Sequence, residues 1–330
     1  MAGSFKAFVV NKVSDHFVSG ILDMTRDSLP EREVVIRVDY SSINYKDGLA
    51  ITGKAPILKT FPIVPGVDYA GTIQMSASPD LHPGDRVIVN GFEVGERHWG
   101  GFAQYAGAKA DWVVPLPERF STWQAMAIGT AGYTAMLCVM TLEDQKVRPD
   151  DGDVLVTGAS GGVGGVAVAL LAKLGYTVIA STGRPETQDY LKELGAAGFI
   201  GRDELTGKGR PLNTARWAGA VDVVGGVTLA NVLSMIKYGG AVAATGLAGG
   251  GDLPATVYPF ILRNVALAGV DSVLCPKPRR VEAWRRLAKD LPEAAIEAVA
   301  STIPLGDVPK AAEDIMANRV KGRLVVDVNA

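Results

Sequence analysis

The chain has 330 residues, of which 48% are hydrophobic and 21% are charged, and its formal net charge at pH 7 is −2. This length and composition allow one large or two medium domains with a sizeable core, and they exclude a disordered chain. The nearly balanced charge argues against general nucleic-acid and membrane-surface binders, and two distant cysteines, Cys138 and Cys275, predict no disulfide framework and favour the cytoplasm.

Residues 1–124 are predicted to form a small, barrel-like β domain. Short apolar runs at 5–10, 33–40, 63–73 and 86–89 are separated by turn signals such as Pro83-Gly84. Many short strands at close spacing are typical of such a domain. The first ten residues lack the apolar run of a signal peptide, and the apolar stretches elsewhere are interrupted before they could span a membrane.

The pattern changes after this domain. A helix is predicted over 121–140, where Ala, Met and Leu follow the potential caps Ser121 and Thr122. Strands are then predicted at 154–157, 176–180, 220–224, 240–245 and 266–270, with helices at 164–174, 185–194 and 228–237. This alternation predicts an α/β fold with a doubly wound parallel sheet. The tail is predicted to contain helices at 278–290 and 308–318 and a strand at 323–328.

A glycine-rich turn, Gly158-Ala159-Ser160-Gly161-Gly162-Val163-Gly164-Gly165, joins the first of these strands to a helix. Glycines let a pyrophosphate approach the backbone closely, and a helix start offers free N–H groups to the anion. This context predicts a dinucleotide phosphate loop, with Ser160, Gly161, Gly162 and Val163 at the pyrophosphate. An ordinary strand-to-helix turn is the alternative.

The end of the second strand indicates which nicotinamide cofactor binds. It has the sequence Ser181-Thr182-Gly183-Arg184, with no acid before Glu186. An NAD site needs an acid here for the ribose, whereas Arg pairs with a phosphate. We therefore expect NADPH, with Thr182, Gly183 and Arg184 at the ribose phosphate and Arg202 as a second candidate on the adenine side. The alternatives are that Arg184 and Arg202 are solvated and that Glu186 binds the ribose.

Motifs along nearly the whole chain carry a family resemblance. They include Ser42-Ile43-Asn44-Tyr45-Lys46-Asp47, Pro65-Gly66-Val67-Asp68, the segment 129–135, the glycine loop and Lys321-Gly322-Arg323. In this order they resemble the medium-chain dehydrogenase/reductase superfamily. The resemblance implies a GroES-like catalytic domain over 1–124, a Rossmann NADPH-binding domain over 125–272 and a return to the catalytic domain over 273–330. Within the superfamily, the segment 44–54 is most similar to the acrylyl-CoA reductase branch (AcuI type), which is related to quinone oxidoreductases.

Zinc alcohol dehydrogenases share this fold, but their ligands are missing from the sequence. Gly66-Val67-Asp68 stands where those enzymes have Gly-His-Glu, the segment 44–47 has no Cys, and the two cysteines cannot form a four-cysteine lobe. We therefore expect no metal. Without a Lewis acid, reduction of an activated C=C bond is favoured over alcohol oxidation.

The resemblance implies reduction of acrylyl-CoA to propionyl-CoA, with hydride transfer to the β-carbon and protonation of the α-carbon. Tyr45 is the best candidate for donating a hydrogen bond to the developing enolate, and Asn44 and Asp47 are candidates for orienting it. Tyr45 could instead only position the cofactor, and Asp47 could belong to a structural turn. The catalytic Tyr of mitochondrial-type enoyl thioester reductases has no counterpart at Gly53-Lys54-Ala55.

Other residues are expected near the ligands. Leu247, Ile261, Ser272 and Asn318 are candidates for the cofactor, with turn capping as the alternative for Ser272 and Asn318. Lys277, Arg279 and Arg280 are either anchors for the phosphates of an acyl-CoA thioester or a solvated helix start.

The sequence leaves three alternative functions open and predicts one oligomeric state. An acyl-CoA reductase, a reductase of free quinones or enones, and a non-catalytic NADPH-binding protein all fit the sequence. The apolar edge strand at 266–270 predicts a homodimer that pairs edge to edge. Neither a nucleic acid nor a membrane is an expected partner.

Overall fold

The fold is described from a computed structural model that covers residues 3–14 and 16–330. The chain divides into two compact units. Unit 1 contains the described residues up to Thr130 together with Val273–Ala288 and Ile296–Ala330, and unit 2 contains Ala131–Ser272 and Lys289–Ala295. The C-terminal part of the chain therefore returns to the first unit. The exact domain boundaries expected from the sequence stay predictions.

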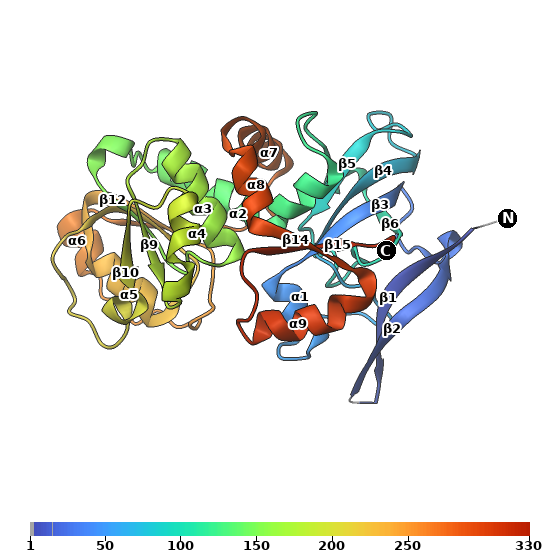
Figure 1. Ribbon diagram of the computed structural model, residues 1–330, viewed down its shortest axis with the longest axis horizontal. Helices are drawn as coiled ribbons and strands as arrows, with labels where there is room; N and C mark the ends of the chain where they lie inside the picture. Colours follow the sequence, from blue (N-terminus) through green and yellow to red (C-terminus); the bar gives the residue numbers. More distant parts are fainter. Residues whose placement is uncertain (1–2, 15) are drawn as a thin grey trace. The chain divides into compact units, whose positions relative to one another are not determined.

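Unit 1 is built on a seven-stranded sheet (Figure 1). Its strand order is β14-β15-β3-β4-β5-β7, and β6 also pairs with β3. The strands are β3 (Val34–Ile43), β4 (Asp68–Ser76), β5 (Arg86–Asn90), β6 (Tyr105–Ala108), β7 (Val113–Pro115), β14 (Ala300–Pro304) and β15 (Arg323–Asp327). β15 runs antiparallel to β3 and parallel to β14, so a strand from the tail lies inside the sheet of the N-terminal domain. The predicted β-rich domain is confirmed.

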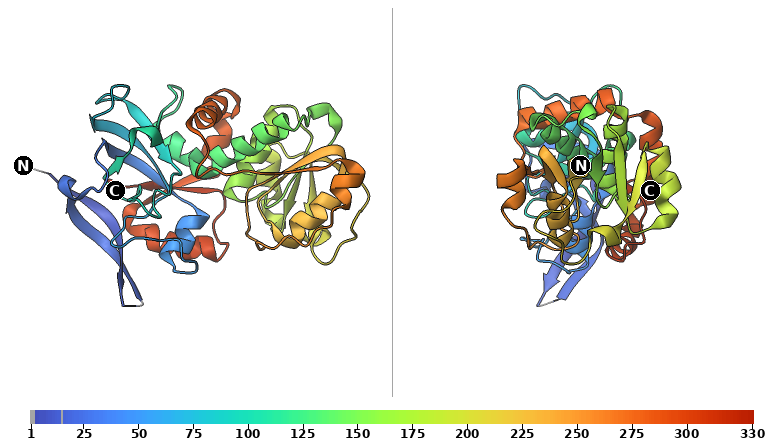
Figure 2. Two further views of the ribbon diagram at one scale, coloured as in Figure 1. Left: turned by 180° about the vertical axis from the view of Figure 1, so that it is seen from behind. Right: turned by 90° about the vertical axis from the view of Figure 1, so that its left-hand side faces the viewer.

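Two further features complete unit 1. An antiparallel ribbon of β1 (Ser4–Val13) and β2 (His16–Thr25) extends away from the sheet (Figure 2). Helix α1 (Tyr45–Ile51) packs against α9 (Val308–Met316). The two helices approach closely at Gly48, where a Cβ would lie 3.0 Å from the Met316 sulfur. Helices α7 (Lys277–Asp290) and α8 (Glu293–Val299) precede β14.

Unit 2 is a doubly wound parallel sheet, as predicted. The strand order is β10-β9-β8-β11-β12-β13, with α3 and α4 on one face and α5 and α6 on the other (Figures 1 and 2). The strands are β8 (Val154–Val156), β9 (Val178–Thr182), β10 (Gly198–Gly201), β11 (Trp217–Asp222), β12 (Ile236–Ala244) and β13 (Ala266–Gly269). The helices are α3 (Gly162–Lys173), α4 (Gln188–Glu193), α5 (Gly226–Ser234) and α6 (Tyr258–Arg263).

The predicted helix over 228–237 is wrong at its end. Helix α5 stops at Ser234, and β12 begins at Ile236 because that residue pairs with Trp217 of β11. Sheet pairing therefore overrides a sequence that continues in a helical pattern.

Helix α2 (Thr122–Asp144) is long and apolar enough to cross a membrane by length and composition. However, 89% of its most apolar window is buried inside the protein, as in a core helix. The helix is interrupted at Gly129, whose backbone is non-helical (φ 53°, ψ −162°). This break lies next to the boundary between the two units and contributes directly to the site described next.

Candidate active site and cofactor site

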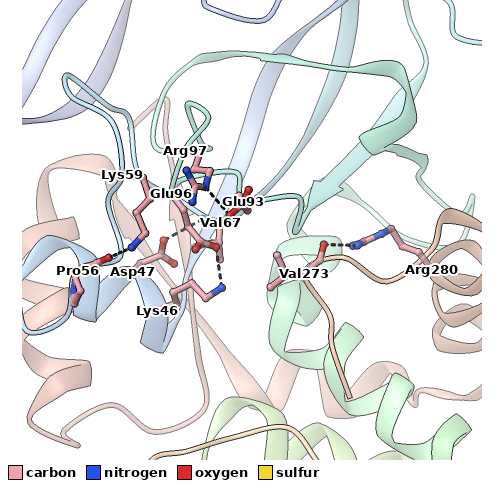
Figure 3. A network of polar contacts seen from close by, with 10 residues as sticks. All are labelled: Lys46, Asp47, Pro56, Lys59, Val67, Glu93, Glu96, Arg97, Val273 and Arg280. Atoms are coloured by element: carbon pink, nitrogen blue, oxygen red, sulfur yellow. Dashed lines mark hydrogen bonds and ion pairs between the residues drawn. The ribbon is translucent and has the colours of Figure 1, made fainter. Parts of the chain in front are cut away.

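The start of α1 is fixed by Asp47. Its Oδ2 accepts a hydrogen bond from the Asn44 backbone N–H at 2.8 Å, and its Oδ1 accepts one from the Val67 N–H at 3.1 Å (Figure 3). The first bond is half of a capping box, which satisfies a free N–H group at a helix start. Tyr45 is then the first residue of the helix, and it remains 45% exposed although Asp47 is fully buried.

A second buried carboxylate holds the segment before this helix. Asp68, the first residue of β4, accepts hydrogen bonds from the Ser42 N–H at 3.1 Å and the Ser42 hydroxyl at 2.6 Å. Its other oxygen accepts from the Asn44 side-chain amide at 3.1 Å and from the Thr130 N–H at 2.7 Å. Such bonds are what make a buried carboxylate tolerable.

Arg323, the first residue of β15, supplies the positive charge of this network. Its guanidinium donates to the Ser42 hydroxyl at 2.6 Å and to Asn44 Oδ1 at 3.0 Å. The Asn44 amide therefore bridges Asp68 and Arg323, which fixes its orientation. A Cβ on Gly129 would collide with the Arg323 guanidinium, so the break in α2 makes room for this arginine.

Burial and a neighbouring charge shift the pKa of Asp47. Burial first and the Asp68 carboxylate second raise the pKa of Asp47 to about 7, while the N–H groups of Asn44 and Val67 act in the opposite direction. Asp47 therefore changes charge near neutral pH, in the first turn of the helix that begins with Tyr45.

These residues do not fit a zinc ion. Among residues 3–14 and 16–330, no group of three His, Cys, Asp or Glu side chains could hold a metal. The carboxylates of Asp47 and Asp68 already accept N–H and O–H groups, and Val67 provides no ligand atom. A metal-free enzyme stays a prediction.

The neighbouring loop after β5 is tied to α1. Lys46 forms an ion pair of 2.8 Å with Glu96, and both are partly buried (Figure 3). Phe92 and Glu93, at the start of this loop, have φ angles of 53° and 57°, which non-glycine residues seldom adopt. The Phe92 N–H donates to the Val273 carbonyl at 2.8 Å, which holds the turn in place.

Arg280 is neither a solvated residue nor a phosphate anchor, so that prediction is wrong for it. It is fully buried, its guanidinium donates to the Asn90 carbonyl at 2.6 Å and the Val273 carbonyl at 3.1 Å, and it lies 4.4 Å from the centre of the Phe92 ring. Figure 3 shows this arginine bonded to Val273. Lys277 likewise donates to the Ala110 carbonyl at 3.1 Å. Lys277 and Arg280 therefore bind backbone carbonyls, and the role of Arg279 stays a prediction.

The glycine loop of unit 2 has the geometry of a phosphate cradle. Gly158 has a φ of 58°, and a Cβ on Gly164 would collide with the Gly158 carbonyl oxygen. Helix α3 follows with Gly161 at its N-cap and no side chain bonded there. The Gly161 N–H donates to the Gly158 carbonyl at 3.0 Å, so it is the N–H groups at the first residues of α3, Gly162 and Val163, that can be offered to an anion. These residues fit the pyrophosphate of a dinucleotide.

Predicted ribose-phosphate residues meet beside this cradle. The hydroxyls of Ser160 and Thr182 lie 3.3 Å apart, and the Arg184 guanidinium donates to the Ser160 hydroxyl at 2.9 Å. Arg202 is exposed, but a Cβ on Gly183 would lie 3.1 Å from its guanidinium carbon. The absence of a side chain at Gly183 thus lets the second arginine approach this corner, which fits a phosphate on the ribose.

The remaining candidates are not gathered with these residues by any described contact. Leu247 and Ile261 are 65% and 68% exposed, and Ser272 is half-buried after β13. Asn318 is exposed just beyond α9, and its N–H donates to the Ile315 carbonyl at 3.0 Å with a φ of 56°. Their roles at the cofactor stay predictions.

Sequence reasoning missed the functions of Ser42, Asp68 and Arg323. All three lie in the quoted motifs, but no role was assigned to them. A useful signal would have been charged residues beside β-branched runs, as at Arg323-Leu324-Val325-Val326, because a charge within an apolar strand needs a buried partner.

Comparison with known proteins defines the family. Residues 30–118 match the alcohol dehydrogenase GroES-like domain, and residues 162–304 match the zinc-binding dehydrogenase family. The chain is 53% identical to the acrylyl-CoA reductase AcuI of Ruegeria pomeroyi, over 99% of this chain and 100% of that protein. It is 46% identical to the putative quinone oxidoreductase YhfP of Bacillus subtilis, over 99% of both chains.

Solved structures agree. The yhdH oxidoreductase from Salmonella enterica, solved in complex with NADP, has a TM-score of 0.96 and 53% identity, over 98% of this chain and 99% of that chain. The Bacillus subtilis protein yhfP, solved with NAD bound, has a TM-score of 0.95 over 98% and 99%. The chain therefore belongs to the medium-chain dehydrogenase/reductase superfamily, in the group that contains the AcuI acrylyl-CoA reductases and the putative quinone oxidoreductase YhfP.

Proposed function

We propose that this protein is an NADPH-dependent reductase that converts acrylyl-CoA to propionyl-CoA. The observation that carries the proposal is the 53% identity to an acrylyl-CoA reductase along the full length of both chains. The two arginines beside the Ser160–Thr182 corner support NADPH over NADH, because a 2′-phosphate needs cationic partners.

Within this proposal, unit 1 assists the charge that develops on the substrate. When bound, NADPH supplies the hydride that adds to the β-carbon of the enoyl thioester. The Tyr45 hydroxyl donates a hydrogen bond to the thioester oxygen, where negative charge builds up. Asn44 and Asp47 hold the start of α1 so that Tyr45 is presented in one orientation. A hydroxyl or a water molecule then protonates the α-carbon.

Unit 2 holds the cofactor in this proposal. Ser160, Gly161, Gly162 and Val163 bind the pyrophosphate, and Thr182, Gly183, Arg184 and Arg202 bind the ribose phosphate. Leu247, Ile261, Ser272 and Asn318 are proposed to contact the rest of the cofactor.

A substrate panel tests the function. Purified protein is mixed with acrylyl-CoA, free quinones or small enones, each with NADPH or NADH, and propionyl-CoA is identified by mass spectrometry. The proposal requires the fastest turnover with acrylyl-CoA and NADPH. Faster reduction of quinones would favour the function named for YhfP, and NADPH binding without turnover on any acceptor would indicate a non-catalytic protein.

Tyr45→Phe tests the donor role because it removes only the hydroxyl. We expect kcat with acrylyl-CoA to fall by about 100-fold or more. If the hydroxyl only positions the cofactor, the NADPH dissociation constant will rise while kcat at saturating NADPH stays close to that of the wild type.

We also propose a cytoplasmic homodimer that binds neither nucleic acid nor membrane. Cys138 and Cys275 are both free and buried, which suits a reducing compartment. Strand β13 lies at one end of the six-stranded sheet, and the neighbouring α6 exposes Ile261 and Leu262. An open edge beside apolar side chains supports pairing with a second copy.

A further inference from the structure

Unit 2 contains a buried carboxylate that the proposed reaction does not use. Asp222 is the last residue of β11 and is fully buried. Its Oδ1 accepts a hydrogen bond from the Thr157 hydroxyl at 2.7 Å, and its Oδ2 accepts one from the Gly225 N–H at 2.7 Å. The Thr157 oxygen in turn accepts from the Val223 N–H at 3.1 Å. Both carboxylate oxygens are therefore bonded to the loops that follow the strands.

The strand register explains why these groups meet. β8 and β11 are parallel neighbours, and Val156 pairs with Val221. Thr157 follows Val156, and Asp222 follows Val221. The two side chains therefore lie side by side where the strands end. Ligands of an open parallel sheet bind outside this edge. Thr157 also comes directly before Gly158, the first residue of the phosphate cradle.

Asp222 connects this cradle to two other loops. Its backbone carbonyl accepts the Thr245 N–H at 2.9 Å, where β12 ends. Gly225 has a φ of 72°, and a Cβ there would lie 2.7 Å from the Gly250 carbonyl oxygen. A Cβ on Gly158 would similarly lie 2.6 Å from Val223. The loops after β8, β11 and β12 therefore pack so closely that no side chain fits at Gly158 or Gly225.

We infer that Asp222 is a positioning residue for NADPH, which fixes the glycine loop in its binding conformation through Thr157. The inference rests on the proposed function in that NADPH is the ligand. A loop held in advance loses less conformational freedom on binding, so the affinity depends on the clamp although Asp222 itself does not touch the cofactor.

The dissociation constant of NADPH tests the inference directly. Thr157→Val keeps the side-chain shape and removes the hydroxyl, and Asp222→Asn places an amide N–H group against one of the donors. We expect each change to weaken NADPH binding by about 10- to 100-fold, because each disrupts hydrogen bonds to a buried charge. Thr157→Ser retains the donor hydroxyl. Its NADPH dissociation constant should therefore lie within about threefold of the wild-type value, because the hydrogen bond to Asp222 is kept.

A control separates positioning from general destabilisation. Val178 is fully buried at the amino end of β9, the opposite end from the cradle, so Val178→Ala should lower the thermal midpoint and leave the NADPH affinity unchanged. Amide hydrogen exchange without cofactor should accelerate at residues 158–163 in Thr157→Val and not in Val178→Ala. If Thr157→Val fails to fold, Asp222→Asn gives the same comparison.

The outcomes are distinct. A wild-type protein that does not bind NADPH would refute the proposed function. Wild-type binding with an unchanged affinity in Thr157→Val and Asp222→Asn would refute the inference alone, as would a loss of affinity that Val178→Ala reproduces at an equal loss of stability.

Discussion

Asp47 is the residue at which burial and hydrogen bonding oppose each other most directly. Both oxygens accept backbone N–H groups, which favours the charged form, yet burial beside Asp68 raises the pKa to about 7. An unfolded aspartate has a much lower pKa, so the folded chain binds this proton more tightly. This contribution to stability is present at low pH and is lost as the pH rises toward 7.

The difference in unfolding free energy between the wild type and Asp47→Asn should therefore depend on pH. As the pH rises toward about 7, the wild type should lose up to about 1.4 kcal/mol per pH unit relative to the variant, and the difference should level off above that value. Urea unfolding across the pH range measures it, and the other titrating groups cancel in the comparison. A constant difference at every pH would contradict the raised pKa.

At the same scale, Arg184 and Arg202 are the residues that we propose to select NADPH over NADH. We expect Arg184→Ala and Arg202→Ala each to weaken NADPH binding by about 10-fold or more and to leave NADH binding nearly unchanged, because NADH has no 2′-phosphate to lose a charged partner. Equilibrium titration with both cofactors measures the ratio. An equal loss for NADH would mean that the arginines only support the loop.

At the scale of elements, the break in α2 at Gly129 leads to a prediction about stability. Gly129→Ala places a Cβ against Arg323 in a backbone conformation that side chains seldom adopt. We expect a loss of at least about 2 kcal/mol of stability from the strain and the lost guanidinium contacts. Gly306→Ala is the control in the same unit, because a Cβ there meets nothing within 4 Å. Equal stability of the two variants in urea unfolding would contradict this account.

The sequence predicts those elements whose structure depends on neighbouring residues, and it misses those that depend on distant contacts. The glycine loop was found because its glycines, the strand before it and the helix after it are adjacent in sequence. Helix α6 was missed because it has only six residues, and the end of α5 was misplaced because pairing with β11 decides it. The network around Asp68 could not be predicted, because Arg323 and Asn44 are 279 residues apart and no local pattern records their contact.

At the scale of the whole molecule, the exposed side chains of α6 should determine assembly. Leu262→Asp places a charge on α6 beside the open β13 edge, and we expect it to reduce the mass in solution from twice 34.6 kDa to that of one chain. Val13→Asp, on the β1–β2 ribbon, should leave the dimer intact. Sedimentation equilibrium measures both, and a monomeric wild type would refute the assembly.

The position of β15 near the end of the chain determines the order in which the two units can complete their folding during translation. Unit 2 is nearly complete once the ribosome has released Ser272, whereas the sheet of unit 1 lacks an internal strand until Arg323–Asp327 emerges. Because domains fold as units during translation, a nascent chain arrested before Arg323 should bind the cofactor while its α1 remains unsecured. We therefore expect the unit that is proposed to bind the cofactor to mature first, and the proposed donor Tyr45 to be positioned only after β15 has joined the sheet.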